Sequence, residues 1–214
     1  MNESANVTYT CPYCGRGFEI EVWPVIYGDG DEDLRDRCLS GDLFRHSCPH
    51  CKHEFMVQND LVYIDRIHKF VIWVSEKDPG SDLIRFTGPL KDAGYVLRRC
   101  PTLQEFSMKI QVLEDEVDDR MVELARYDSF IEFVNNKKGT PEEVTSVEYQ
   151  RTENGVMKIN VRTDDKGMSF LIPVSMLEEE MEENASVYEI DNESFPVIND
   201  AWIISLFTDS MGEA

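Results

Sequence analysis

The chain lacks an apolar run that could cross a membrane, because no stretch approaches the roughly 18 uncharged apolar residues that a spanning helix needs. Residues 1–10 contain neither Lys or Arg nor an apolar run, so we expect no export signal. Basic residues are also scarce, since 21 Lys and Arg stand against 42 Asp and Glu, a formal net charge of −21. Nucleic-acid binding relies on Lys and Arg, so this balance disfavours it.

Motifs for catalysis are missing too. No Gly-rich phosphate loop and no G-x-S-x-G sequence occurs, and residues 101–214 contain no histidine. Helical di-metal sites combine carboxylates with Glu-x-x-His motifs, so the acids of residues 114–119 are interpreted as solvated or helix-capping groups. We therefore predict that the protein is not an enzyme.

The charge is unevenly distributed along the chain. Residues 1–100 carry 16 acidic and 12 basic side chains, whereas residues 101–214 carry 26 and 9. The second half is thus a poor candidate for binding nucleic acid. A basic face near the cysteines stays open as an alternative, and its residues are Arg16, Arg35, Arg37, Arg45 and Lys52.

Composition indicates a globular protein, since 42% of the 214 residues are hydrophobic and 29% are charged. The length suits one large domain or two small ones. Four of the six cysteines form two C-x-x-C pairs, which without an export signal favours metal or redox chemistry over disulfides. We expect a cytoplasmic location.

The first hundred residues predict a mainly β region. Alternation over residues 17–23 predicts a strand, residues 31–40 predict a short helix that ends at Gly41, and residues 43–46 predict another strand. Further β-rich runs lie in residues 53–58 and 61–76, followed by a turn at residues 78–81 and a strand at residues 94–98.

The composition changes at Pro101. Thr102 and Glu105 have the spacing of a capping box, and an apolar stripe continues to Val134 as one helix or two. Three β runs then predict a meander, with Asn154-Gly155 as a hairpin turn. Residues 173–184 predict an acidic helix, and residues 202–207 a closing strand or helix.

The strongest motif is a repeated C-P-x-C, formed by Cys11 with Cys14 and by Cys48 with Cys51. Zinc takes four tetrahedral ligands, and each C-x-x-C turn supplies two sulfurs, so the two turns together predict one structural Zn²⁺ site. Gly15 after the first pair can adopt positive φ, whereas Lys52 holds that place in the second. Residues 15–47 separate the pairs, which indicates an insertion.

Two other readings of the cysteines stay open. C-P-Y-C also occurs in glutaredoxin-like proteins, where a helix follows directly and lowers the thiol pKa, but here a predicted strand follows. A catalytic zinc would need an open ligand position, with His46, His50 or His53 replacing a cysteine. Cys38 and Cys100 are expected to be small buried residues, the alternative being a redox-sensing pair.

The sequence resembles the CpXC domain proteins of bacteria and archaea. The resemblance rests on CPYCGRGFEIEVW, on LFRHSCPHCKHEFMV and, less specifically, on the segments that follow to about residue 130. It implies a zinc-ribbon-like start and a cytoplasmic bacterial setting, but no substrate.

These observations predict an α+β protein in three parts: a zinc-ribbon-like β-rich lobe with an inserted short helix (1–100), a helical segment (101–139), and an acidic lobe with an antiparallel meander and helices (140–214). The expected function is a non-enzymatic zinc-binding module that interacts with a protein partner. The alternatives are nucleic-acid binding through the ribbon lobe and thiol redox chemistry at C-P-Y-C.

Overall fold

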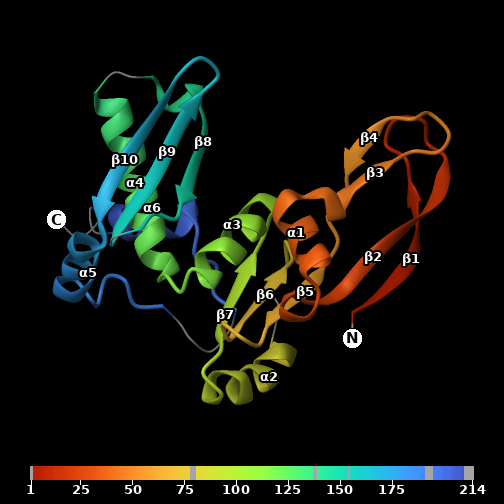
Figure 1. The fold of residues 1–214 in the computed structure, drawn as a ribbon, viewed down its shortest axis with the longest axis horizontal. Coiled ribbons are helices and arrows are strands. Elements are labelled where there is room, and N and C mark those ends of the chain that lie inside the picture. The colour runs from red at the N-terminus through yellow and green to blue at the C-terminus, as the bar shows by residue number, and fades with distance from the viewer. Residues whose placement is uncertain (1, 78–80, 137–138, 154, 191–194, 210–214) are drawn as a thin grey trace. The chain divides into compact units, whose positions relative to one another are not determined.

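The computed structural model describes residues 2–77, 81–136, 139–153, 155–190 and 195–209, with backbone alone for 81–86 and 209. Contacts divide the chain into two units (Figure 1). Unit 1 comprises residues 1–111 and 192–197, and unit 2 comprises residues 112–191 and 198–214. The fold is mixed α+β, which confirms the predicted class.

The strands of unit 1 form two sheets. A five-stranded sheet has the order β1-β2-β5-β6-β7, and a two-stranded sheet joins β3 to β4. The β2–β5 and β6–β7 pairs are parallel, while the other neighbours are antiparallel. The strands are β1 (Glu3–Thr10), β2 (Gly17–Tyr27), β3 (Arg45–Ser47), β4 (Glu54–Met56), β5 (Leu61–Asp65), β6 (Phe70–Val74) and β7 (Val96–Cys100).

Strand β2 serves two partners in succession. Its residues 17–22 pair with β1, its last two residues, Ile26 and Tyr27, pair with β5, and Val25 between them pairs with Glu3 of β1 and with Val62 of β5. The register with β1 shifts around Trp23 and Pro24, so a bulge separates the two halves. One strand therefore connects the β1–β2 hairpin to the central sheet (Figure 1).

Helix α1 (Glu32–Ser40) matches the predicted helix closely. The Asp31 side chain accepts a hydrogen bond from the Leu34 N–H at 3.1 Å, and Gly41 ends the helix with φ of 77°. Helix α3 (Leu103–Glu114) places Phe106 against Phe44 and Tyr63, which are all buried. The unit therefore has an aromatic core beside its sheet.

Two elements of unit 1 were not predicted. In strand β1, Ala5, Val7 and Tyr9 alternate with polar residues, but seven of its eight residues are exposed, and no strand was predicted from this short pattern. Helix α2 (Ser81–Asp92) contains Gly88 and Pro89, two residues that weaken a helical pattern. The predicted turn at 78–81 lies outside the described residues except for Ser81, which begins α2.

The predicted strand at residues 43–46 was displaced. A 3₁₀ turn, η2 (Asp42–Phe44), comes first, and β3 begins only at Arg45. Leu43 and Phe44 are both buried, so their apolar character reflects the core and not a strand. A second 3₁₀ turn, η1 (Gly28–Gly30), precedes α1.

A short segment near the C-terminus also belongs to unit 1. The Arg99 N–H in β7 donates to the Pro196 carbonyl at 3.0 Å, and the Phe195 ring meets Trp73 edge-on at 6.0 Å between centroids. The edge strand β7 thus gains its outer contact from residues that follow most of unit 2 in sequence.

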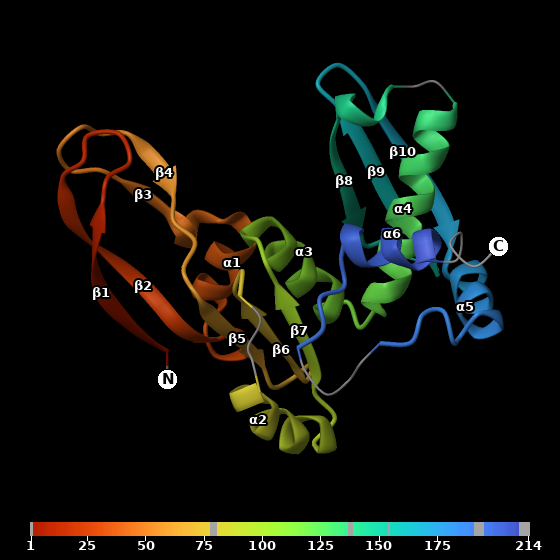
Figure 2. The ribbon, with the colours of Figure 1, turned by 180° about the vertical axis from the view of Figure 1, so that it is seen from behind.

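Unit 2 contains the predicted meander, with strand order β10-β9-β8. Figure 2 shows helix α4 lying along the sheet. The elements of the unit are α4 (Asp119–Asn135), η3 (Pro141–Glu143), β8 (Val144–Gln150), β9 (Val156–Thr163), β10 (Gly167–Pro173), α5 (Val174–Glu183) and α6 (Asp200–Asp209). Gly155 has φ of 67°, as the predicted hairpin turn requires, while Asn154 lies outside the described residues.

The apolar stripe after Pro101 forms two helices, α3 and α4. Glu116 has φ of 56°, and the Asp118 side chain accepts from the Arg120 N–H at the start of α4. Asp115 accepts from the Tyr149 hydroxyl and from Arg151. The Asp118 cap agrees with the interpretation from the sequence, whereas Asp115, a hydrogen-bonded structural group, and Asp119, which is 1% exposed, are neither solvated nor shown to cap a helix.

Gly28 shows how tightly unit 1 is packed. A Cβ atom there would lie 1.8 Å from the Tyr63 hydroxyl oxygen, and Tyr63 is fully buried. We expect Gly28→Ala to lower the free energy of unfolding by about 1–3 kcal/mol through overpacking. Urea denaturation measures this change.

Gly88 in α2 is the matched control, because a Cβ there meets nothing within 4 Å. Gly88→Ala should leave stability unchanged or raise it by up to about 1 kcal/mol. Equal losses at the two glycines would contradict the close contact with Tyr63.

Candidate metal centre

Two strand connections carry the four cysteines of the motif. Cys11 and Cys14 lie between β1 and β2, and Cys48 and Cys51 lie between β3 and β4. The two hairpins place all four sulfurs within 4.8 Å of one another. The residues that sequence analysis chose as metal ligands are therefore brought together.

The two connections repeat each other in backbone hydrogen bonding. The Cys11 N–H donates to the Arg16 carbonyl at 3.0 Å, and the Gly15 N–H donates to the Cys11 carbonyl at 2.9 Å. The second turn repeats both bonds, from Cys48 to His53 at 3.0 Å and from Lys52 to Cys48 at 2.9 Å. The same tight turn is thus built twice.

Each turn ends with a residue of positive φ, Gly15 at 70° and Lys52 at 65°. Glycine adopts this conformation freely, whereas a residue with a Cβ pays roughly 1–2 kcal/mol. Lys52 therefore has the geometry of the glycine it replaces, at a local energetic cost. The difference between Gly15 and Lys52 at this position was already evident from the sequence.

The sulfur positions suit one tetrahedral ion. Cys11 Sγ lies 3.7 Å from Cys51 Sγ, and Cys14 Sγ lies 3.7 Å from Cys48 Sγ. A tetrahedron with metal–sulfur bonds of about 2.3 Å has edges of about 3.8 Å. A disulfide needs about 2.05 Å, so these cysteines are free thiols placed at metal-ligand distances.

An aromatic cluster packs between the two hairpins that carry the cysteines. Tyr9, Phe18 and Phe55 pack against the buried side chains Ile20, Val22 and Val57. Phe18 and Phe55 meet edge-on at 6.2 Å, and Tyr9 stacks on Phe55 at 5.5 Å. The cluster joins the hairpin β1–β2 to the hairpin β3–β4 independently of any ion.

The packing of Phe18 and Phe55 was not predicted from the sequence, although their spacing from the cysteines is a signal. Phe18 follows Cys14 by four positions, and Phe55 follows Cys51 by four positions. The repeat between the two motifs thus extends beyond C-P-x-C. At the surface, Tyr13 is 59% exposed and stacks on His53 at 4.5 Å.

The two cysteines of the second motif, Cys48 and Cys51, differ in their pKa values. Burial raises the pKa of Cys48, but hydrogen bonds from the N–H groups of Cys51 and His50 and from the Cys51 and Cys11 thiols together lower it to about 6. The His53 N–H favours the Cys51 thiolate, yet burial and the neighbouring sulfurs raise its pKa to about 12. The cluster thus readily forms one thiolate, while further ones repel each other unless a cation joins them.

The remaining cysteines lie elsewhere in unit 1. Cys38 and Cys100 are fully buried, as expected, and burial raises the pKa of Cys38 to about 12. A thiol of that kind is unreactive. Among the described residues, the four-cysteine group alone has the composition and spacing to hold a metal, and no histidine belongs to it.

The five basic residues considered from the sequence are partly neutralised by acids, and two of them, Arg35 and Arg37, belong to helix α1. Arg35 pairs with Asp36 at 2.9 Å, and Arg45 lies 3.6 Å from Asp42. Arg37 lies 4.0 Å from Asp33. Within the described residues, Arg16 and Lys52 alone of the five candidates have no acidic partner.

Fold and site together define a mixed α+β protein with a four-cysteine cluster able to hold a metal ion. Comparison with protein families matches residues 9–126 to the family described as CpXC protein. This match spans more than half of the chain, so the protein belongs to the CpXC family. Searches of curated proteins and of solved structures found no match.

The structure also bears on the membrane question. No helix in the described part of the chain combines the length and the apolar character that crossing a bilayer requires.

The strained turn gives a test of local geometry. Lys52→Gly removes a cost of roughly 1–2 kcal/mol and adds backbone freedom worth roughly 0.5–1 kcal/mol to the unfolded chain. We expect a net stabilisation of up to about 1 kcal/mol, seen as a higher midpoint of thermal unfolding.

The matched variant is Gly15→Ala, which places a Cβ at the same backbone conformation where it meets no atom within 4 Å. It should destabilise by about 1–2 kcal/mol through backbone strain alone. If Lys52→Gly lowered stability, or Gly15→Ala left it unchanged, the equivalence of the two turns would be wrong.

Proposed function

We propose that Cys11, Cys14, Cys48 and Cys51 bind one structural Zn²⁺ and that the protein is a non-enzymatic interaction module. The observation that supports this most directly is the 3.7 Å spacing between sulfurs of different turns, which fits the edge of a zinc–thiolate tetrahedron. Four thiolates suit zinc, which is soft enough for sulfur and prefers tetrahedral coordination.

A closed ligand shell leaves no position for water or substrate. The zinc would act by joining the hairpins β1–β2 and β3–β4 at their turns, in addition to the aromatic cluster that packs between them. Its role is then to hold the ribbon surfaces in place for a protein partner. We place this protein in the cytoplasm, where thiols stay reduced.

We also propose that the ribbon-containing region, residues 1–100, depends on the metal, while the acidic region after residue 140 does not. The meander β8–β10 has its own buried side chains, among them Ile159 and Val161, and contains no cysteine. The helices of residues 101–139 would link the two.

Metal analysis tests the zinc assignment. Protein purified without added metal should contain about one zinc per chain, and Cys51→Ser should lower this content while Cys38→Ser should not. Cys38 is a fair control because it is buried away from the cluster. Absence of zinc in the unaltered protein, or equal loss in both variants, would refute the site.

Chelation tests the dependence of each region. A strong chelator should abolish hydrogen-exchange protection in β1–β4, because structural zinc contributes to folding free energy outright. Peptides from β8–β10 should keep their protection. Loss of protection in both regions at the same chelator concentration would contradict separate stabilities.

Nucleic-acid binding is the second candidate. It is motivated by Arg16 and Lys52 beside the exposed Tyr13 ring, since aromatic rings stack on bases. Against it, three of the five basic residues considered from the sequence have acidic partners. A bound zinc with four thiolates would add two negative charges.

Single-stranded DNA and RNA in a salt series decide this candidate. We expect no binding at 150 mM salt, and no change in any weak binding upon Tyr13→Ala. Salt-dependent binding that falls by about tenfold in the joint Arg16→Ala and Lys52→Ala variant would favour the nucleic-acid role instead.

Thiol redox chemistry is the third candidate. Its requirement is a reactive thiolate at the start of a helix, but Cys11 is 1% exposed and the chain continues from Cys14 into strand β2. Stoichiometric zinc in the metal analysis proposed above would leave no free thiolate at this motif.

A further inference from the structure

Strand β1 is an unusual edge for a five-stranded sheet. In the described residues it pairs with β2 alone, and it stands at the end of the strand order. Seven of its eight residues are exposed, and its sequence, ESANVTYT, has no proline or lysine. Proteins ordinarily protect such edges with those residues, because an open edge pairs readily with another chain.

The hydrogen-bonding pattern between β1 and β2 determines which backbone groups of β1 point away from β2. The Cys11 N–H donates to Arg16, so this pair is a hydrogen-bonded one. Hydrogen-bonded and non-hydrogen-bonded pairs alternate along an antiparallel ladder. Thr8, three residues before Cys11, pairs with Glu19, so this pair is a non-hydrogen-bonded one. The N–H groups that face away from β2 therefore belong to Asn6, Thr8 and Thr10.

One face of the hairpin at this edge is acidic. Glu19 and Glu21 are exposed on β2 and pair with Thr8 and Asn6. Ser4 donates to Glu21 at 2.7 Å, which places these groups on one face. Residues 1–15 contain no Lys or Arg. Adjacent strands lie about 4.8 Å apart, so a basic side chain on a third strand can reach across Thr8.

The opposite face is apolar. Tyr9 and Phe18 pair across the ladder and pack on the cluster of Ile20, Val22 and Val57. Val7 lies on the same face and is 40% exposed at the open edge. A further strand would cover Val7 with one of its own apolar residues. A strand that pairs with β1 should therefore carry basic side chains on one face and apolar side chains on the other, so that the two types alternate along its sequence.

We propose that β1 is a docking edge for an extended segment of a partner protein in which basic and apolar residues alternate. The segment adds a sixth strand to the sheet, pairs with the outward groups of Asn6, Thr8 and Thr10, and directs its basic side chains toward Glu19 and Glu21. A second copy of this chain is disfavoured, because it would bring two such acidic faces and two charges of −21 together.

This inference deepens the proposed interaction role and rests on it. Zinc bound at Cys11 would hold the C-terminal end of β1 in place. The site itself is nevertheless formed by backbone and carboxylate groups, so it can fail while the zinc assignment stands. Zinc content and exchange protection are therefore measured in every sample used below.

The probe is a fluorescent peptide, Lys-Val-Lys-Val-Lys-Val-Lys, with blocked ends, titrated by anisotropy against the full-length protein. A peptide of the same composition, Lys-Lys-Lys-Lys-Val-Val-Val, controls for unspecific attraction to an acidic protein. We expect the alternating peptide to bind at least about tenfold more tightly, since only it can form a two-faced strand. Equal binding of the two peptides would overturn the proposal.

Thr8→Pro removes one outward N–H while sparing the ladder to β2, because proline is tolerated where the N–H faces solvent. It should weaken peptide binding by about tenfold. Thr8→Val is the matched control, since it alters the side chain and keeps the N–H. Unchanged binding in Thr8→Pro with zinc retained would refute strand addition.

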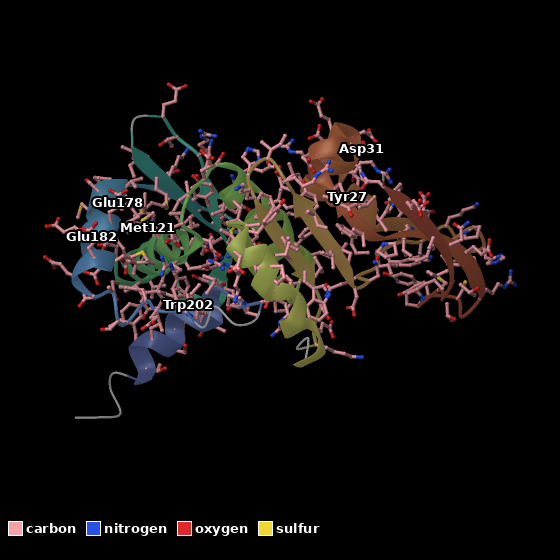
Figure 3. All side chains as sticks on the ribbon, turned by 90° about the horizontal axis from the view of Figure 1, so that it is seen from below. Tyr27, Asp31, Met121, Glu178, Glu182 and Trp202 are labelled. Atoms are coloured by element: carbon pink, nitrogen blue, oxygen red, sulfur yellow. The ribbon has the colours of Figure 1, made fainter. Side chains whose placement is uncertain are left out.

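The charge contribution is tested by Glu19→Gln with Glu21→Gln, which should weaken binding by about three- to tenfold at low salt. Glu178→Gln with Glu182→Gln is the control, because these exposed acids project from α5 in unit 2 (Figure 3) and change the net charge equally. An equal effect of both pairs would indicate unspecific attraction and contradict the docking edge.

Hydrogen exchange on the unaltered protein gives an answer even if Thr8→Pro fails to fold. Saturating peptide should slow exchange at the amides of Asn6, Thr8 and Thr10. Protection elsewhere with none at these three amides would overturn the proposal. So would concentration-dependent dimerisation that is abolished by Thr8→Pro, since the occupant would then be a second copy.

Discussion

The convergence of two C-P-x-C turns on one point is the constraint on which the ribbon of unit 1 depends. Each turn is held by the same pair of backbone hydrogen bonds and ends with a residue of positive φ. Phe18 and Phe55, which each follow the last cysteine of their motif by four positions, then pack together. Because β1 ends where the first turn begins, the position of the edge strand is set by this meeting of turns.

Much of this could be predicted from the sequence, because the signals were local. Asp31 and Gly41 bracket α1 with cap residues, and C-P-x-C specifies a turn with its ligands. The meander followed from alternation and a glycine turn. The cluster of four cysteines could be named without a structure because its members are the same residue type in a repeated spacing.

The elements that were missed have only weak local signatures. In strand β1 the alternating Ala5, Val7 and Tyr9 are a short pattern on a mostly exposed segment, and pairing with β2 makes it a strand. Gly88 and Pro89 obscure α2. Leu43 and Phe44 were predicted to form a strand because burial in the core and strand formation favour the same apolar residue types. In each case a contact made elsewhere in the chain decides the structure.

The hydrogen bond from Arg99 to Pro196 matters for the order in which the protein can fold. A chain emerging from the ribosome can form the two hairpins, and bring their four cysteines together, as soon as the first half is available. The outer side of β7 must wait until unit 2 has been synthesised. During that interval the new sheet has an uncovered second edge, so the time taken to translate unit 2 sets how long a half-finished sheet is exposed to other chains.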